Sequence, residues 1–565
     1  MNEKQIKETE TWVLYEKGRN FLRMKNVYVD TDKNYRFYNG NQWDRAKLGD
    51  VEPVQKNFIK PIVKYKVGVI HDNLYSIVYS SENFEEKEFR EYAEKVCEML
   101  NRKAGNIWEK DKMDFKGRRI TKDSAINDEG IIYVTWDTEN NTPVNEIIKK
   151  NDIYYGNEND DNIQSQPYII IRKRVPVVNA INLAIENGLS RDKIDLIVGD
   201  NDTFDESGED AKQEIDNMVT ILLKMWKSEK EVHFSMATRY CDIFEDKNSK
   251  LTFYPVAHDI WEELEGSARG EGEVRYLIPN QIEVNKTEMR RVLAVKQQAY
   301  PQKVVNIDKI KNPNSINQVG GTIKISGGTT AEDVKRYVTT LTPATMSPDV
   351  KQLQEDLIQV TRELAGAGDI ATGTINPEQA SGKAILAVQN AMKSPMTEQK
   401  ESYKNFIEDL AKIWLDMIIT YSEKGIVLEY EETDPSTGKK TIIPEKVHQD
   451  ALKKIRASVK VDVTPRSPFD KFAQELSIEN LFSKGMFNIQ KLQELKTYVE
   501  LLDDDSVMPK QKLEKAVKIM EEEQQKIALI NAQAQMMQQK ADMFLNQDPE
   551  AQASMINSYT TEATE

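Results

Sequence analysis

Residues 276–300 are YLIPNQIEVNKTEMRRVLAVKQQAY, and the part between Pro279 and Pro301 contains no glycine. Ile282 and Leu293 fall on one side of a helix drawn through it. Because proline marks both ends, the segment predicts one straight helix of roughly 30 Å, at 1.5 Å per residue.

A second helix is predicted over 347–364, SPDVKQLQEDLIQVTREL. Ser347 can cap its N-terminus, Pro348 suits the first helical position, and Asp349 favours the positive end of the helix dipole. Its apolar residues recur at the three-four spacing of a packed seam: Val350, Leu353, Leu357, Val360 and Leu364. This seam could pack within one copy of the chain or between copies, and both alternatives stay open.

Between the two helices lies a short segment, 301–346, that is rich in turn residues such as Gly320-Gly321 and Gly327-Gly328. Two strand-like runs, 304–307 and 322–325, lie between its turns. The order predicted is therefore helix, small insert, helix, with the insert at the tip of two long helices.

The sequence on both sides of this arrangement predicts an α+β protein that is predominantly helical. On the N-terminal side we expect helices over 3–25, 84–103 and 105–127, an aromatic turn over 35–43, a helix with Ile59, Ile62, Val63, Ile70 and Leu74 at helical spacing, and strands over 131–136, 168–172 and 232–234. On the C-terminal side we expect a small-residue loop over 366–380, a long helix kinked near Lys393 by Pro395, a hairpin of 426–430 with 441–443, a strand over 458–463, and helices from 468 onward.

The composition restricts the class of protein. A chain of 565 residues with 39% hydrophobic residues can form about three to five domains. Its net charge of -16 argues against a protein whose whole surface grips DNA phosphates. Two cysteines argue against a disulfide framework and fit a reducing cytoplasm, and no apolar run approaches the ~20 residues that cross a bilayer. We therefore expect no membrane partner.

No catalytic, metal-binding or cofactor-binding pattern is found. The four histidines have no partner at zinc spacing. The glycine-rich segment 266–272 lacks the ending of a phosphate loop, so we interpret it as a flexible linker. The acidic clusters at 160–161, 200–210 and 503–505 lack the spacing of a calcium loop, which favours solvated charge over a metal site. We expect no enzyme.

The order of elements resembles the portal (head-to-tail connector) family of tailed bacteriophages. Five stretches carry the likeness: Phe37–Trp43 (FYNGNQW), Asn57–Val63 (NFIKPIV), Tyr276–Asn285 (YLIPNQIEVN), Glu378–Ile385 (EQASGKAI) and Val461–Pro465 (VDVTP). Each is weak alone, and their shared order across nearly the whole chain is the stronger signal.

The resemblance implies a portal fold assembled as a ring. Its expected parts are a wing over 1–275, a first stem helix over 276–300, a clip over 301–346, a second stem helix over 347–365, a tunnel loop over 366–380, further wing over 381–465, a helical crown over 466–545, and a disordered tail over 546–565. The segment between the strands near 170 and 232 is longer than the resemblance explains.

The function implied is a ring of about twelve subunits at one capsid vertex, through which DNA is packaged and ejected. The implied partners are the chain itself, double-stranded DNA held transiently, the terminase large subunit, a head-completion or tail adaptor, and the major capsid and scaffolding proteins. The implied location is the virion, with assembly in the host cytoplasm.

Two groups of residues are candidates for the channel. Cationic positions that could face DNA are Lys286, Arg290, Arg291, Lys296 and Lys383; the alternative is that they are solvated charges or ion pairs between subunits. Tunnel-loop candidates are Gly366, Gly368, Thr372, Gly373 and Asn376, where glycine lowers the cost of changing φ and ψ; the alternative is an ordinary connection. A nuclease-like packaging enzyme lacks its motifs, and a non-channel helical scaffold or adaptor remains the alternative function.

Overall fold

The structure is a computed structural model, and it describes the chain in segments. These are 7–44, 52–81, 87–200, 202, 217–318, 346–367, 394–422, 426–433, 440–447 and 457–465, with shorter runs and single positions between 320 and 342 and between 496 and 538. The chain divides into two compact units, Met1–Thr464 and Pro465–Glu565. Among the described helices, none has the length and apolarity that crossing a membrane requires.

The largest sheet of the first unit has five antiparallel strands. In order they are β4 (Ile153–Tyr155), β5 (Ile169–Pro176), β6 (Met218–Ser228), β7 (Glu231–Ala237) and β8 (Asp242–Asn248). Helix α1 (Glu10–Met24) covers one face, where Trp12 packs near Ile170 and Leu222. Helix α6 (Val177–Glu186), followed by the short α7 (Arg191–Ile194), packs on Val219 and Ile221. Neighbouring residues of β6 thus serve opposite faces, as strand geometry requires.

A three-stranded sheet forms the centre of the main core. Its order is β3 (Thr142–Ile148), β2 (Glu129–Asp137) and β9 (Val256–Ile260), all antiparallel. Helices α5 (Met113–Asn127) and α12 (Thr397–Tyr421) both pack on it. Trp414 of α12 is fully buried and donates its ring N–H to Asn145 Oδ1 over 2.9 Å. The predicted strand over 131–136 is confirmed as part of β2.

Three further helices and one strand pair complete this part. They are α2 (Val27–Asn39), α3 (Ile59–Ile70), α4 (Lys87–Lys110), and β1 (Asn73–Ser81) paired with β14 (Ala457–Pro465). The predicted aromatic turn over 35–43 is wrong in its first half, because the helix continues to Asn39 and the chain turns at Gly40, with φ of 97°. Leu74, expected on a helix, lies in β1. The break between α4 and α5 falls at 111–112 rather than near 104, with Lys112 at φ 52°.

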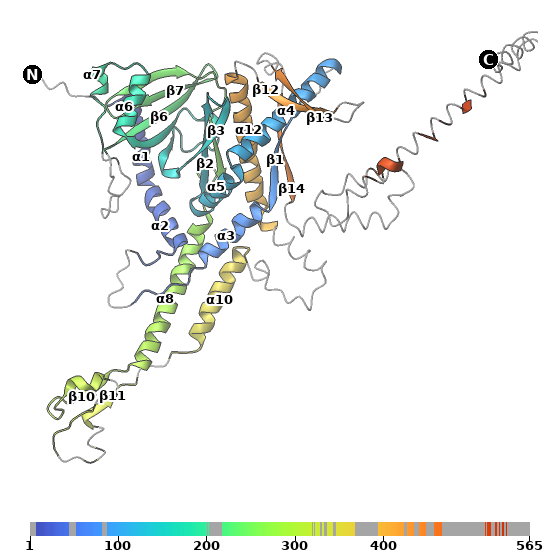
Figure 1. The fold of residues 1–565 in the computed structure, drawn as a ribbon. Coiled ribbons are helices and arrows are strands. Elements are labelled where there is room, and N and C mark those ends of the chain that lie inside the picture. The colour runs from blue at the N-terminus through green and yellow to red at the C-terminus, as the bar shows by residue number, and fades with distance from the viewer. Residues whose placement is uncertain are drawn as a thin grey trace, which may run out of the picture. The chain divides into compact units, whose positions relative to one another are not determined.

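The predicted helix, insert and second helix are all present (Figure 1). Helix α8 (Glu273–Ala299) has 27 residues, or about 40 Å, and begins earlier than the predicted boundary at Pro279. Helix α10 (Asp349–Leu364) begins one residue later than expected, because Pro348 is its N-cap and not its first residue; Ser347 Oγ still accepts the N–H of Asp349 over 3.3 Å. The extended backbone of Gly272 ends just before Glu273, so the helix starts there. Pro279 therefore lies in the second turn of α8 and does not start the helix.

The insert between the helices contains one small sheet. Strand β10 (Lys303–Val305) pairs with β11 (Val338–Thr340), and a 3-10 turn, η3, spans Pro313–Asn317. The strand predicted over 322–325 is reduced to a single bridge between Ile325 and Ile310.

The predictions for the C-terminal part are only partly covered by the described residues. The hairpin is confirmed as β12 (Ile426–Thr433) with β13 (Lys440–Val447). Pro395 lies in a 3-10 turn, η4 (Ser394–Met396), directly before α12. The kink near Lys393 and nearly all of the predicted crown and tail lie outside the described residues. In the second unit, the few described positions beyond Pro465 are helical.

Candidate functional site on the helix pair

Helices α8 and α10 lie side by side and run antiparallel, with the insert at their far end (Figure 1). Asn280 Nδ2 donates to Thr361 Oγ1 over 2.9 Å. Further along α8, Arg291 donates to Gln354 Oε1 over 2.6 Å. Residue numbers rise along one helix while they fall along the other, which fixes the antiparallel arrangement.

The contact between the two helices is polar and well buried. Gln354 is only 1% exposed, and its Nε2 donates to Glu288 Oε2 over 2.7 Å. Burial raises the pKa of Glu288, but the Gln354 hydrogen bond and the positive charges of Lys56 and Arg291 together leave this pKa lower than usual. Glu288 is therefore held as a carboxylate between the helices, where it accepts from both partners.

The apolar seam of α10 points away from α8. Leu353 is 63% exposed, Val360 48% and Leu364 82%, and only Leu357 packs against the core. Helix α10 thus buries Gln354 and Thr361 and exposes three apolar side chains, the reverse of what is usual on a surface helix. We call Leu353, Val360 and Leu364 the outer ridge. An exposed apolar row of this kind is typical of a surface that another molecule covers.

The root of α8 is joined to the N-terminal segment by two buried amides. Gln281 Oε1 accepts the backbone N–H of Phe58 over 3.0 Å, and its Nε2 donates to Lys56 O over 2.7 Å. Asn285 Oδ1 accepts the backbone N–H of Lys56 over 3.1 Å and also the Gln281 amide over 2.9 Å. We call Gln281 and Asn285 the root clamp; both are at most 2% exposed.

The root clamp brings together three stretches that are far apart in the sequence. Asn285 Nδ2 donates to Gln42 Oε1, and Gln42 Nε2 in turn donates to Phe37 O over 3.0 Å. Asn57 Nδ2 donates to Tyr38 O over 3.0 Å. The stretches that begin at Phe37, Asn57 and Tyr276 therefore meet at one place. In the sequence, the only sign of this site is that these Asn and Gln residues stand among apolar neighbours. The sequence did not show that their side chains bind one another.

The structure separates the cationic channel candidates. Lys286 pairs with Glu283 at 2.7 Å, Arg291 with Glu288 at 3.0 Å, and Lys296 with Glu52 at 2.6 Å. Their interpretation as charges that face DNA is weakened, because each already has a carboxylate partner.

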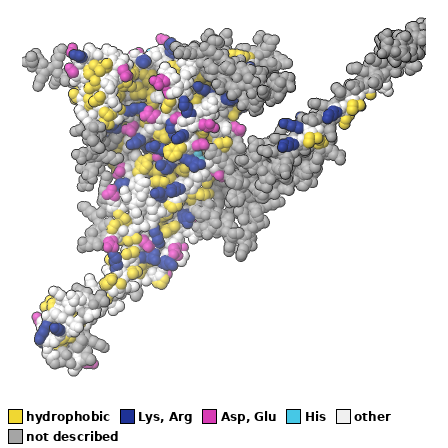
Figure 2. Space-filling model, in the orientation of Figure 1, with side chains coloured by type: hydrophobic (Ala, Val, Ile, Leu, Met, Phe, Trp, Pro, Cys, Tyr) yellow, Lys and Arg dark blue, Asp and Glu magenta, His cyan; other side chains and the backbone are white. Residues whose placement is uncertain are grey.

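The other two cationic channel candidates are Arg290 and Lys383. Arg290 is exposed and forms no ion pair with any carboxylate of the described segments. Lys383 lies outside the described residues. Figure 2 shows side chains of both charges and apolar side chains interspersed over this face of the helix pair.

Only the first tunnel-loop candidate is described. Gly366 ends α10 in the left-handed region, with φ of 67°, and donates its N–H to Glu363 O over 2.9 Å. A side chain at this position would be strained, so glycine is needed to end the helix there. Gly368, Thr372, Gly373 and Asn376 lie outside the described residues.

Asp202, in the acidic segment after Gly199, is not a solvated charge, while 203–210 lie outside the described residues. Asp202 is 8% exposed and accepts from Tyr15 at 2.5 Å, from Arg19 at 2.6 Å and from Arg172 at 3.2 Å. Its role is to anchor the start of this segment on α1 and β5, which the local composition did not reveal. Within the described part of the chain, no group of histidine, cysteine or acidic side chains could hold a metal ion.

The glycine-rich segment 266–272 is not a flexible linker. Arg269 is 6% exposed and forms ion pairs with Glu129 and, at 2.8 Å, with Glu158. A Cβ atom added to Gly272 would lie 2.9 Å from the backbone N of Asp128. The glycines thus allow a close approach at the entry to α8, a packing role that the spacing alone did not indicate.

Comparison with known proteins adds one match to these observations. A family model for phage P22-like portal proteins matches residues 171–558, which is more than half of the chain and includes both helices and the insert. No curated protein matches the chain. With the helix pair, its insert and the root clamp in place, this match shows that the chain belongs to the phage P22-like portal protein family.

Proposed function

We propose that copies of this chain close into a ring of about twelve subunits and form the DNA channel at one capsid vertex. The observation that carries the proposal is the outer ridge: Leu353, Val360 and Leu364 are exposed on α10, whereas Gln354 and Thr361 of the same helix are buried and bonded to α8. In a ring, each subunit presents one face to the different face of its neighbour, so the ridge of one copy would be covered by the next.

The charge of the chain suits rapid passage of DNA. Phosphate contacts dominate nucleic-acid affinity, and many of them would hold the duplex in place. With a net charge of -16, and with three of the cationic candidates paired to glutamates, a channel of these subunits would bind DNA weakly. Among the described candidates, Arg290 is the one we assign to transient contact with the duplex.

The insert is the part we assign to docking. Since β10 and β11 lie at the far end of the helix pair, they are exposed to large partners (Figure 1). We assign the terminase large subunit during packaging, and a head-completion or tail adaptor afterwards, to this insert. The sheet-containing part of the first unit is assigned to contact with major capsid and scaffolding proteins.

The alternative is a helical scaffold or adaptor without a channel. It would require neither an apolar ridge for a neighbouring copy to cover nor an insert carried on two long helices, whereas the structure contains an exposed ridge and such an insert. We therefore rank it second.

A complementation experiment tests the proposal. Particles assembled in cells without the gene for this chain are compared with particles supplied with the wild-type chain, and nuclease-protected DNA is measured. We expect protected genome-length DNA only when the chain is present. Equal DNA protection without the chain would contradict the proposed channel.

A further inference from the structure

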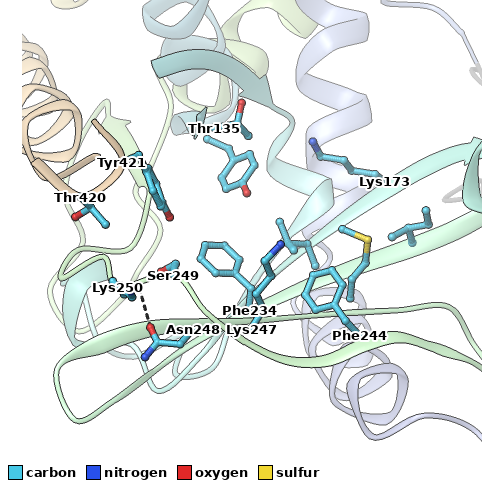
Figure 3. Close-up of a pocket in the computed structure, with 14 residues that line it drawn as sticks. Thr135, Lys173, Phe234, Phe244, Lys247, Asn248, Ser249, Lys250, Thr420 and Tyr421 are labelled. Carbon is cyan, nitrogen blue, oxygen red and sulfur yellow. Dashed lines mark hydrogen bonds between the residues drawn. The ribbon is translucent and has the colours of Figure 1, made fainter. Parts of the chain in front are cut away.

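A cavity of about 500 Å³ lies apart from the helix pair, between the five-stranded sheet and the C-terminal end of α12 (Figure 3). Its floor is apolar and comes from three neighbouring strands: Leu223 of β6, Phe234 of β7 and Phe244 of β8. Leu223 is 7% exposed, whereas the two phenylalanines are only partly buried. Apolar surface left open in this way is stabilised when another side chain covers it.

The rim of this cavity is cationic. Lys173, Lys247 and Lys250 line it, and its lining contains no aspartate or glutamate. Lys173 pairs with Glu146, outside the lining, whereas Lys247 and Lys250 pair with no carboxylate of the described segments. On a chain with a net charge of -16, a site whose charged lining residues are all lysines favours an anionic partner.

We propose that this cavity is a docking socket for an acidic peptide segment of another protein, in which one bulky apolar side chain fills the floor and flanking carboxylates meet the lysines. We call it the lysine socket. A single anchor in a pocket surrounded by charged pairs is a common way for one protein to recognise a segment of another.

A second copy of the chain is a poorer occupant. One described segment of matching chemistry is 262–265, where Leu264 is 39% exposed between glutamates. It follows Ile260, which pairs with Glu129 at the first residue of β2. The lysine socket uses Tyr133 and Thr135 instead, so the two sites lie roughly 13–20 Å apart along that strand, at 3.3 Å per residue.

This pairing is disfavoured in a ring whose axis follows the helix pair, an arrangement that we add to the proposed function and on which this step rests. The start of β2 is also the end next to α8, since Gly272 contacts Asp128, and the socket lies toward the opposite end. Rotation about an axis that follows the helix pair does not change a point's level along that axis. A neighbouring copy would therefore not bring its Leu264 to the lysine socket.

The test is selection of short random peptides on the purified full-length chain, followed by fluorescence anisotropy with the selected, labelled peptides. We expect acidic peptides with one aromatic or leucine residue. Their binding should weaken at least about tenfold, or 1.4 kcal/mol, for the double variant Lys247→Glu and Lys250→Glu. The matched control is Lys309→Glu with Lys311→Glu, two exposed lysines of the insert, which should bind the peptides as the wild type does.

An accessibility experiment distinguishes the possible occupants. Cys97 and Cys241 are buried, so a cysteine introduced as Thr135→Cys at the rim can be labelled by maleimide selectively. We expect labelling in both free and assembled chains, and protection by the selected peptides. Protection from maleimide that appears only on assembly would show that a second copy fills the socket. Protection that is already present in the free chain would show that a segment of the same chain fills it. Either result overturns the proposal.

Selection of peptides without acidic residues, equal binding to the lysine variant, or no selected peptide at all would also overturn it. Ring formation is scored separately on the same samples by mass. If rings form but the selected peptides do not bind the lysine socket, the socket proposal fails and the proposed function stands. If the peptides bind but no rings form, the proposed function fails and the socket proposal stands.

Discussion

Phe58 donates its backbone N–H to Gln281 Oε1 over 3.0 Å, although 223 positions separate the two residues in the chain. The bond joins the start of α3 to the root of α8, and Asn285 strengthens it from one helical turn further on. A displacement of the helix pair at its root must therefore either carry the N-terminal segment with it or break a buried amide network. Such networks are costly to break when only one partner is removed.

Gln281→Leu should lower the free energy of unfolding by about 2–3 kcal/mol, because it leaves the buried Phe58 N–H and the partly buried Lys56 carbonyl without partners. Urea unfolding followed by tryptophan fluorescence measures the loss. The control is Gln352→Leu on the exposed side of α10, which should change stability by less than about 0.5 kcal/mol. Similar effects of both substitutions would contradict the root clamp.

Replacing the outer ridge, with Leu353→Ser, Val360→Ser and Leu364→Ser together, should abolish or strongly weaken assembly. Each of these side chains gains roughly 1.5–3 kcal/mol when it is fully buried. Since all three are exposed in the single chain, its own thermal unfolding should change little. Mass photometry and thermal unfolding measure the two effects.

The matched control for the outer ridge is Val178→Ser with Ile185→Ser, which are 65% and 57% exposed on α6. These substitutions should leave assembly intact. Rings that form normally from the ridge variant would remove the main support for a contact through α10.

Arg290→Ala and Arg291→Ala should separate DNA contact from stability. Arg291 holds Glu288 and Gln354, so its loss should destabilise the helix pair by about 1 kcal/mol. Arg290 has no such partner among the described residues, and its replacement should change DNA packaging while leaving unfolding unchanged. Calorimetry and a packaging assay measure these effects, and the assignment of Arg290 fails if its variant packages DNA normally.

Asp259 should make stability fall as the pH rises. Burial raises the pKa of this carboxyl to about 7, more than the hydrogen bond from Ser124 Oγ at 2.7 Å lowers it. The folded state therefore holds the proton more tightly than the unfolded state does. Its contribution to stability is present below the ordinary carboxyl pKa and is lost as the pH rises through about 7.

The variant Asp259→Asn should consequently lose less stability than the wild type between pH 5 and 8, by up to a few kcal/mol. Ser124→Ala should move the same loss to a higher pH range, because it removes the bond that favours the charged form. Urea unfolding at a series of pH values measures both. Parallel pH profiles for Asp259→Asn and the wild type would show that another group controls this range.

Shortening the segment 368–376 should leave ring assembly intact and impair DNA packaging or retention, because the proposed tunnel loop would no longer reach the duplex. Protected DNA per particle is the measurement, with ring mass as its control. Unimpaired packaging by rings of normal mass would end the tunnel-loop assignment.

Sequence periodicity predicted both helices of the pair, but it did not predict which side of each helix is buried. The three-four spacing of Val350 to Leu364 required a helix, and one is present. It did not indicate that the buried side would be the one with Gln354 and Thr361, since this depends on polar partners supplied by α8. Likewise, Pro279 marked the neighbourhood of a helix start, while the actual start depends on the packing of Gly272 against Asp128.

Long-range contacts account for most of what the sequence did not show. Asp202 looked like part of a solvated acidic run, yet its partners Tyr15 and Arg19 come from α1, more than 180 positions away. The lysine socket is also formed by long-range contacts, since Lys173 of β5 and Phe234 of β7 meet Phe244 and Lys247 of β8 there. Local patterns cannot predict groupings that arise only when sheets pair.

Negative-stain electron microscopy combined with mass photometry on the purified full-length chain tests the central claim most directly. The account predicts rings with a central hole and a mass near that of about twelve copies of the 65.0 kDa chain. A stable dimer or an elongated rod would contradict it and would favour a scaffold or adaptor without a channel.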